Sequence, residues 1–245
     1  EISAQNKLED FRKLNSNYKF PSFSTISGSG PNSAIIHYKA TIKSNRVLKK
    51  GDLYLVDSGG QYHYGTTDVT RTICFAKQSK RIKNIFTKVL KGHINVVTYR
   101  LNKNTTGEKI DKVARAPLKK IGLDYAHGTG HGVGYFLNVH EGPQAISKSN
   151  KIKLIEGMIL SNEPGFYKTN EFGIRIENLI FVKKKQNKLK FENLTLAPIE
   201  KNLIDFSLLN KTEKKYINNY HKKVYSTLSP YLKKKEKTWL RSFFQ

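Results

Sequence analysis

Apolar residues recur at helical spacing near the start of the chain and again after Ser79. The first run predicts a helix over residues 3–14, because one in three or four positions is apolar there. Its apolar face consists of Leu8, Phe11 and Leu14. Ser79 is a predicted N-cap for a longer helix that continues to about residue 100. The buried face of this longer helix is predicted to contain Ile82, Ile85, Phe86, Val89 and Leu90.

Two further segments have helical patterns. Residues 108–121 form the next predicted helix, which Gly122 ends, and Pro117 inside it is expected to bend or split it. The tail from Ile204 onward is helical again in pattern. Its candidate buried positions are Leu208, Tyr216, Tyr220 and Val224.

The rest of the chain has strand-like patterns. Short β-rich runs alternate with Gly, Pro and Asn over residues 20–74, and such runs return over residues 135–198. Because strands and helices are mixed without regular alternation, we expect an α+β fold with an antiparallel sheet. We expect one main domain over residues 1–197 and a helical extension over residues 198–245 that packs on it.

The composition is that of a folded, non-membrane protein. The chain has 245 residues, 38% of them hydrophobic and 11% aromatic, which is enough to bury a core. No apolar run approaches the ~18–20 residues that cross a bilayer, so no membrane partner is expected. The single Cys74 excludes an internal disulfide and favours a reducing compartment, so we expect a cytoplasmic protein.

The formal net charge of +25 at pH 7 raises the question of a nucleic-acid partner. Of the 44 basic residues, 36 are Lys and 8 are Arg, whereas nucleic-acid sites favour the bidentate contacts of Arg. The lysine runs at residues 183–185 and 233–235 are short and resemble solvated faces. We interpret the charge as coding bias and do not expect nucleic-acid binding.

Carboxylates occur where strands are predicted to be buried. The apolar run "LYLVDSGG" ends near Asp57, and "GTTDVTRTICFA" carries Asp68. A hairpin turning between Tyr62 and His63 would pair these two acids directly, with Cβ atoms ~4.5–5.5 Å apart. Two carboxylates so close repel, and a bound cation would remove that cost.

A second pair of carboxylates also lies on two strands that could form one hairpin. "EGMILSNEPGFY" ends a strand at Glu163, and "FGIRIENLIFV" carries Glu177 between apolar neighbours. A hairpin centred on Asn170 would set these two glutamates opposite each other. Two opposed acid pairs in one chain are hard to obtain by chance.

The segment "HGTGHGVGYFLNVHEGP" lies between the two acid pairs in sequence and contains His127, His131 and His140 among five glycines. Glycines of this density let the backbone approach a metal or a substrate closely. His131 is the natural imidazole ligand to add to the carboxylates. Oxygen ligands with one imidazole suit Mn, Co, Zn or Fe, and two such ions ~3.5–4 Å apart can hold a bridging hydroxide that attacks a carbonyl.

These residues resemble the five metal ligands of the pita-bread metallopeptidases, in order and context. The motifs "DSGGQYHYGTTDVTRT", "HGTGHGVGYFLNVHEGP", "NEPGFY", "GIRIEN" and "SGSGPNSAIIHY" are most similar to those of the aminopeptidase P family, the Xaa-Pro aminopeptidases. "LTLAPIEKNLID" resembles the longer, eukaryote-like subtype. The resemblance implies a curved antiparallel sheet flanked by helices and hydrolysis of the N-terminal Xaa-Pro bond by a dinuclear metal site.

The resemblance also implies roles for the ligands. Asp57 is the terminal ligand of one metal, Asp68 and Glu177 bridge both metals, and His131 and Glu163 complete the second. Glu163 also carries the proton from the bridging water to the leaving nitrogen. The implied cofactor is a pair of divalent ions, Mn²⁺ above all, and the implied assembly is a homodimer.

Residues around the metals gain roles in the same way. His37 resembles a histidine of the proline pocket, and His140 resembles one that contacts the substrate near the scissile carbonyl and assists catalysis. His127 resembles a further pocket histidine, although satisfying backbone groups in a tight turn is an equal alternative. Arg175 and Tyr167 lie where the family places a relay behind the Asp57 carboxylate.

Other interpretations remain open at this point. Prolidase and methionine aminopeptidase share the ligand pattern and differ only in motif detail. A pita-bread module that binds protein or nucleic acid without catalysis would suit the charge, but binding alone does not require acids that face each other. The domains that precede the catalytic one in aminopeptidase P, and the opening helices of the catalytic domain, are not found before Glu1, so we expect this domain to be truncated.

Overall fold

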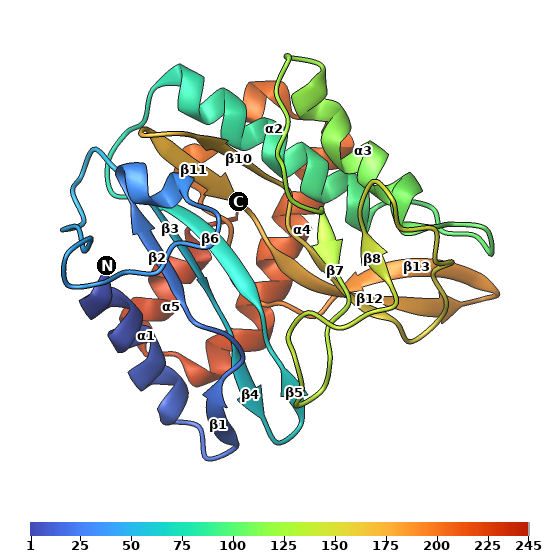
Figure 1. Cartoon of the computed structure of the whole chain (residues 1–245), viewed down its shortest axis with the longest axis horizontal. Helices are drawn as coiled ribbons and strands as arrows, with labels where there is room; N and C mark the ends of the chain where they lie inside the picture. Colours follow the sequence, from blue (N-terminus) through green and yellow to red (C-terminus); the bar gives the residue numbers. More distant parts are fainter. Residues whose placement is uncertain (245) are drawn as a thin grey trace.

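The structure is a computed structural model that describes residues 1–244. Helices and antiparallel strands are mixed in it, as the sequence predicts (Figure 1). The α-helices are α1 (Ile2–Lys13), α2 (Lys80–Val97), α3 (Gly107–Lys119), α4 (Lys211–Leu228) and α5 (Lys234–Arg241). The short 3₁₀ helices are η1 (Gly30–Ala34), η2 (Lys201–Leu203), η3 (Phe206–Leu208) and η4 (Ser229–Tyr231).

The strands form five small sheets in which every pairing is antiparallel. One sheet consists of β2 (Ile26–Ser29), β3 (Leu53–Ser58) and β6 (Val69–Cys74), and a second of β1 (Tyr18–Pro21), β4 (Gly60–Tyr62) and β5 (Gly65–Thr66). A third consists of β13 (Lys188–Asn193), β12 (Asn178–Lys185) and β9 (Ile159–Asn162). The two-stranded sheets are β10 (Gly165–Lys168) with β11 (Phe172–Arg175), and β7 (Gly130–His131) with β8 (Ala145–Ile146).

Helix α2 forms the centre of the main core, as its apolar pattern predicts. Ser79 caps it, because the Ser79 side chain accepts a hydrogen bond from the backbone N–H of Ile82. Ile85, Phe86, Val89 and Leu90 are all buried, and Ile82 packs partly buried against the same cluster. The helix ends at Val97, somewhat before the predicted end.

Helix α3 packs against α2 (Figure 1) and continues through Pro117, so the predicted split is wrong. The proline lies in the last turn, and it lacks the N–H that would bond to the carbonyl of Val113. Asn95 of α2 replaces that donor, because its Nδ2 donates to Val113 O at 3.1 Å. A neighbouring helix therefore removes the cost that would otherwise break α3 here.

The C-terminal helices pack on the same core. Tyr220 and Val224 are buried as predicted, whereas Leu208 and Tyr216 are half-buried. The helix α4 begins only at Lys211, because Asn210 and Glu213 form a capping box there. Lys91 of α2 holds this end of α4, since its Nζ donates to Glu213 Oε2 at 2.7 Å. No helix among residues 1–244 is long and apolar enough to span a bilayer.

The predicted turn between Tyr62 and His63 is one residue too early. Tyr62 pairs with Gly65, so the turn consists of His63 and Tyr64, and Asp57 lies opposite Thr70 and not opposite Asp68. Tyr62 stays in its strand because it also pairs with Tyr18 across β1, with ring centroids 5.5 Å apart. Moving a turn by one residue shifts the register by two, which keeps every side chain on its face.

The second predicted hairpin is confirmed in register. Gly165 pairs with Arg175 and Lys168 with Phe172, so the turn is centred on Asn170, whose φ is 61°. The pairing of Asn162 with Asn178 continues the same register beyond Pro164. Glu163 and Glu177 therefore face each other at the break between the two ladders.

One further sequence prediction is wrong. Residues 135–144 contain no strand, because the chain forms a loop in which Phe136 has a φ of 56°. Helix α1 forms where predicted, but its apolar face is not buried within the described structure, since Phe11 is 59% and Leu14 82% exposed.

Candidate active site

The five predicted metal ligands come together from five different segments. Asp57 lies in β3, and Asp68 lies just before β6. His131 lies in β7, Glu163 follows β9, and Glu177 lies between β11 and β12. Ligand atoms of Asp68, His131 and Glu177 all lie within 4.8 Å of one another, close enough to share an ion.

Two hydrogen bonds orient His131 for metal binding. Its Nδ1 lies 2.8 Å from Gly132 O, which can only accept, so Nδ1 carries the proton. Its backbone N–H donates to Ser161 Oγ at 2.9 Å. Nε2 then offers a lone pair, at 3.4 Å from Asp68 Oδ2 and 3.4 Å from Glu163 Oε1. Two ligands that hold one ion at about 2.1 Å each lie roughly this far apart.

Burial makes the carboxylates unfavourable without a cation. Burial, followed by the charge of Asp57, raises the pKa of Asp68 well above its ordinary value. Burial, followed by the charge of Asp68, raises the pKa of Glu177 well above its ordinary value. Burial also raises the pKa of Glu163. These shifts are the expected result of placing like charges together in a low-dielectric site.

The residues fit a pair of divalent cations. The four carboxylates carry four negative charges when ionised, and the only cation bonded to any of them is Arg175, paired with Asp57 at 2.8 Å within the described residues. Asp57 Oδ1 is buried and has no hydrogen-bond partner among residues 1–244. A buried carboxylate oxygen without a partner is costly, and a metal ion would satisfy it.

A chain of hydrogen bonds leads away from Asp57. Arg175 Nη2 donates to Asp57 Oδ2 at 2.8 Å, and Arg175 Nη1 donates to Tyr167 Oη at 2.7 Å. Tyr167 Oη lies 2.9 Å from His127 Nε2. Burial raises the pKa of Tyr167 to about 12, so its hydroxyl keeps its proton and donates it to His127. The structure thus places Arg175 next to Asp57 and Tyr167 next to Arg175.

His127 has a partner at each ring nitrogen. Its Nδ1 lies 2.7 Å from Gly128 O and donates to it, while its Nε2 accepts from Tyr167. Burial, followed by the charge of Arg175, lowers the pKa of His127 to about 4, so the ring is neutral at pH 7. The alternative that His127 satisfies a backbone group in its own turn is therefore correct as far as Nδ1 goes.

The three predicted substrate histidines line one cavity of about 510 Å³. His37 is exposed at its wall, and His140 lies against His131 with ring centroids 4.1 Å apart. Burial, followed by the charge of His131, lowers the pKa of His140. The same cavity contains all five predicted metal ligands together with Arg175. A cleft of this size, with polar groups converging on one wall, is typical of a small-molecule or peptide site.

The glycines around His131 are explained by close contacts. A Cβ atom on Gly130 would lie 2.0 Å from Ser161 O, and one on Gly132 would lie 1.9 Å from Glu141 O. Both distances are far below any contact between a carbon and an oxygen. The segment therefore needs glycine so that β7 can pass against β9 and present His131 to the carboxylates.

Sequence reasoning missed two hydroxyl residues that hold the ligands. Thr70 Oγ1 donates to Glu177 Oε2 at 2.7 Å and accepts from Arg175 Nε at 3.0 Å. Ser161 Oγ donates to Glu163 Oε1 at 3.0 Å. Thr70 is two residues from Asp68, and Ser161 is two residues from Glu163. Strand alternation places such pairs on one face, so this spacing was the available signal.

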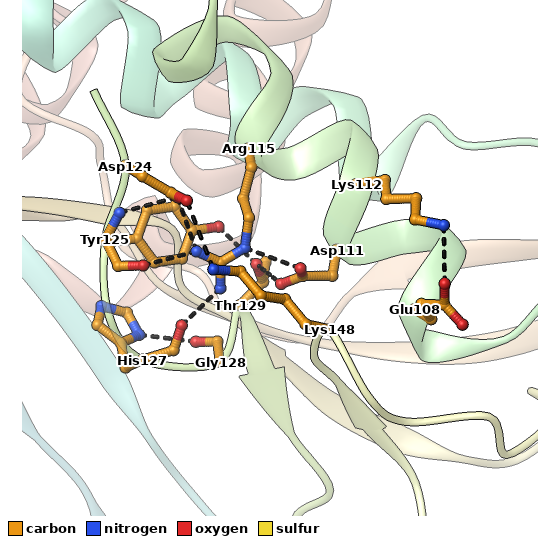
Figure 2. A network of polar contacts seen from close by, with 10 residues as sticks. All are labelled: Glu108, Asp111, Lys112, Arg115, Asp124, Tyr125, His127, Gly128, Thr129 and Lys148. Carbon is orange, nitrogen blue, oxygen red and sulfur yellow. Dashed lines mark hydrogen bonds and ion pairs between the residues drawn. The ribbon is translucent and has the colours of Figure 1, made fainter. Parts of the chain in front are cut away.

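A buried arginine outside the cavity holds the loop that precedes His131 (Figure 2). Arg115 of α3 donates to the backbone oxygens of Tyr125 and His127, each at 2.6 Å, and pairs with Asp111 and Asp124, each at 2.8 Å. Asp111 also accepts a hydrogen bond from Thr129 at 2.7 Å. The local sequence holds one signal for this network, the i,i+4 spacing of Asp111 and Arg115 within a predicted helix.

Two family models match the chain. The model of metallopeptidase family M24 matches residues 1–184, and the model of the C-terminal region of peptidase_M24 matches residues 187–243. "Probable Xaa-Pro aminopeptidase P" of Laccaria bicolor is 48% identical over 98% of this chain and 40% of its own length. "Aminopeptidase P2" of Arabidopsis thaliana is 48% identical over 95% of this chain and 34% of its own length.

Solved structures share the fold. X-prolyl aminopeptidase from Caenorhabditis elegans, described as a cytosolic enzyme with a di-nuclear active site, matches with a TM-score of 0.95 and 39% identity over 100% of this chain and 42% of its own. Prolidase from Pyrococcus furiosus matches with a TM-score of 0.71 and 32% identity over 80% of this chain and 55% of its own. The chain thus has the pita-bread fold and spans about 40% of the length of the curated relatives it matches.

Proposed function

The chain belongs to metallopeptidase family M24, and we propose that it removes the first residue from peptides that have proline in the second position. The observation that carries the proposal is the convergence of Asp57, Asp68, His131, Glu163 and Glu177 in one cavity with three histidines. Relatives at 48% identity are named Xaa-Pro aminopeptidase P and aminopeptidase P2, which supports the same specificity.

The five ligands would hold two divalent ions, for which we propose Mn²⁺. Asp57 would bind one ion, His131 and Glu163 the other, and Asp68 and Glu177 both. When bound, such ions supply Lewis acidity for a carbonyl oxygen and lower the pKa of water. Arg175 and Thr70 hold the carboxylates Asp57 and Glu177 in place by the hydrogen bonds described above, so these ligands need not reorganise.

The chain's own side chains explain why the proline bond would be chosen. The nitrogen of a Xaa-Pro bond carries no hydrogen and must receive a proton when it leaves. We propose that Glu163 delivers this proton, since its carboxylate lines the cavity with Oε1 3.4 Å from His131 Nε2. His37 and His140 would contact the proline ring and the scissile carbonyl, and the carboxylates would attract the free amino terminus of the substrate.

His127 would hold Tyr167 in place and form part of the pocket wall, because its Nε2 already accepts from Tyr167 and its Nδ1 already donates to Gly128 O. We propose a cytoplasmic location, since the similar Caenorhabditis elegans enzyme is described as cytosolic. We also propose that the protein acts as a homodimer and binds neither nucleic acid nor membrane.

Prolidase activity is the second candidate, since the Pyrococcus furiosus prolidase shares the fold at a TM-score of 0.71. The deciding experiment measures bound Mn²⁺ and compares peptides cleaved by the full-length protein. We expect two ions per chain, release of the first residue from Xaa-Pro-Xaa peptides, and poor cleavage of Xaa-Ala-Xaa and N-acetylated peptides. A preference for Xaa-Pro dipeptides would favour prolidase, and equal cleavage of Xaa-Ala and Xaa-Pro peptides would favour a methionine aminopeptidase-like enzyme. Metal-free protein that cleaves nothing but binds a protein or nucleic acid would favour a binding module.

A further inference from the structure

Arg71 is a buried cation that makes no ion pair among residues 1–244. It lies in β6, is 8% exposed, and has no carboxylate within ion-pair distance in the described structure. Burial lowers the pKa of its guanidinium, a direction that reflects the cost of a charge without a counterion. Burying a charge without a counterion costs free energy, so the hydrogen bonds of Arg71 must offset that cost.

The Arg71 guanidinium is bonded to oxygen atoms from four segments of the chain. Nη1 donates to Thr70 O at 2.8 Å and to Glu177 O at 2.5 Å. Nε donates to Pro198 O at 2.9 Å, and Nη2 donates to Ala197 O at 2.7 Å. The remaining acceptors are Asn178 Oδ1 at 2.7 Å and Tyr220 Oη at 3.1 Å.

The contact with Glu177 matters most, because Glu177 is a proposed bridging ligand. Its backbone is held at both ends: the N–H donates to Thr70 O at 3.1 Å, and the carbonyl accepts from Arg71. Its carboxylate accepts from Thr70 Oγ1. The Thr70–Arg71 dipeptide therefore fixes both the main chain and the side chain of this ligand.

The other contacts join this dipeptide to the C-terminal part of the chain. Tyr220 of α4 donates to Ala197 O at 2.7 Å, next to the bond from Arg71. The segment before η2 and the helix α4 are thus connected to Glu177 through one guanidinium. Five N–H donors and six oxygen acceptors are used, which is a geometry that Lys cannot reproduce.

We propose that Arg71 is a positioning residue that couples the docking of the C-terminal segment, through Ala197, Pro198 and Tyr220, to the geometry of Glu177 and hence to metal affinity. The inference rests on the proposed metal site but not on the proposed peptide specificity. Arg71 contacts Glu177 only at its backbone carbonyl and does not line the cavity, so it acts through this ligand and not on the metal or substrate directly. Partners behind a metal ligand change metal affinity about 10–100-fold when they are removed.

The test measures Mn²⁺ affinity by equilibrium dialysis and the melting temperature of the metal-free full chain. We expect Arg71→Lys to lower Mn²⁺ affinity about 10–100-fold. Tyr220→Phe, which removes one hydroxyl and preserves the ring, should lower it about threefold or more, and it decides the question if Arg71→Lys does not fold. If the melting temperature changes while both variants keep wild-type Mn²⁺ affinity, Arg71 stabilises the fold without affecting the metal site, and the proposal is wrong.

Lys91→Met is the matched control. It removes the contacts of Lys91 Nζ with Glu213 Oε2 and with Leu208 O, at 2.7 Å and 3.0 Å, and so loosens α4 without touching Arg71. We expect a lower melting temperature with unchanged Mn²⁺ affinity. If this control weakens Mn²⁺ binding as much as Tyr220→Phe does, general loosening of α4 explains the effect and the specific path through Arg71 is wrong.

Discussion

Arg175 donates a hydrogen bond from Nη2 to Asp57 Oδ2 at 2.8 Å, and both side chains are largely buried, at 2% and 10% exposed. The same guanidinium donates from Nη1 to Tyr167 and from Nε to Thr70. One oxygen of Asp57 is thereby fixed, while the other, Oδ1, has no partner in the described structure. The arrangement leaves Oδ1 as the oxygen of Asp57 that is available to a cation.

Arg175→Lys should therefore lower metal affinity, because an ammonium group cannot bond to Asp57, Tyr167 and Thr70 in the same planar geometry. We expect a loss of about 10–100-fold in Mn²⁺ affinity. Tyr167→Phe leaves the Arg175–Asp57 bond in place and should cost less. Isothermal titration with Mn²⁺ measures both, and equal losses in the two variants would show that the Asp57 contact is not the important one.

Removing the charge of a proposed bridging ligand should abolish turnover. Asp68→Asn and Glu177→Gln preserve the shape of each side chain but remove a ligand charge, so we expect less bound Mn²⁺ and no measurable cleavage of a Xaa-Pro-Xaa peptide. Glu192→Gln on β13, whose acid lies beside Lys183 at the surface, is the control and should behave as wild type. Full metal content and wild-type activity in Asp68→Asn or Glu177→Gln would show that the ligand assignment is wrong.

Metal binding should stabilise the protein more at alkaline pH than at acid pH. The pKa values of Asp68 and Glu177 are raised in the folded state. In the metal-free protein, the two carboxyls contribute fully to the free energy of unfolding below their pKa in the unfolded state, about 4. This contribution is lost as the pH rises through their raised pKa values in the folded state. Metal ions remove that penalty and displace protons. We expect the rise in melting temperature on adding Mn²⁺ to be larger at pH 8 than at pH 5.5, with proton release on binding, and an equal rise at both pH values would contradict this.

Of the two hairpins that carry the acids, the sequence predicted the register of one correctly and that of the other with a shift. The turn at Asn170 was predictable, because Asn tolerates the positive φ of 61° that the turn requires. The turn after Tyr62 was misplaced by one residue, because the pairing of Tyr62 with Tyr18 depends on a strand distant in sequence. The error left Asp68 on the correct face, since the side-chain period of a strand is two.

The partners behind the ligands were harder to predict. Arg175 and Tyr167 were expected only from a family resemblance, and Thr70 and Ser161 had only their two-residue spacing from Asp68 and Glu163. Arg71 gave no signal at all, because it bonds mainly to backbone carbonyls of segments far away in the chain. Backbone acceptors have no sequence signature, so such contacts become visible only once the fold is known.

His140 should affect turnover without affecting metal content. Its ring lies against that of His131, with centroids 4.1 Å apart, but it is not among the three residues whose ligand atoms cluster. His140→Ala should lower kcat by roughly 10²–10⁴-fold if the imidazole assists proton transfer or stabilises charge at the scissile carbonyl. Metal analysis should give wild-type Mn²⁺. A rise in KM with unchanged kcat would limit His140 to substrate binding.

Acid should destabilise the fold through His221, far from the metal site. His221 is 2% exposed, its Nε2 accepts from the Ile199 N–H at 3.1 Å, and its Nδ1 lies 3.0 Å from Phe243 O, to which it donates. Burial lowers its pKa to about 4. Protonation of Nε2 would break the bond to Ile199 and leave a charge without a counterion, so the folded state resists it.

The folded and unfolded states differ in the pKa of His221, so the free energy of unfolding depends on pH. Above the unfolded pKa of about 6.5 both states are neutral and the full stability is present. As the pH falls from there toward 4, only the unfolded state binds the proton, so about 3 kcal/mol of unfolding free energy is lost by pH 4. Urea titrations of metal-free wild type and His221→Gln between pH 7 and pH 4 measure the effect. Because Gln does not titrate, the variant should lose less stability over this range, while the raised carboxylate pKa values act equally on both proteins and cancel in the difference. Parallel losses in the two proteins would show that His221 is not the group that titrates.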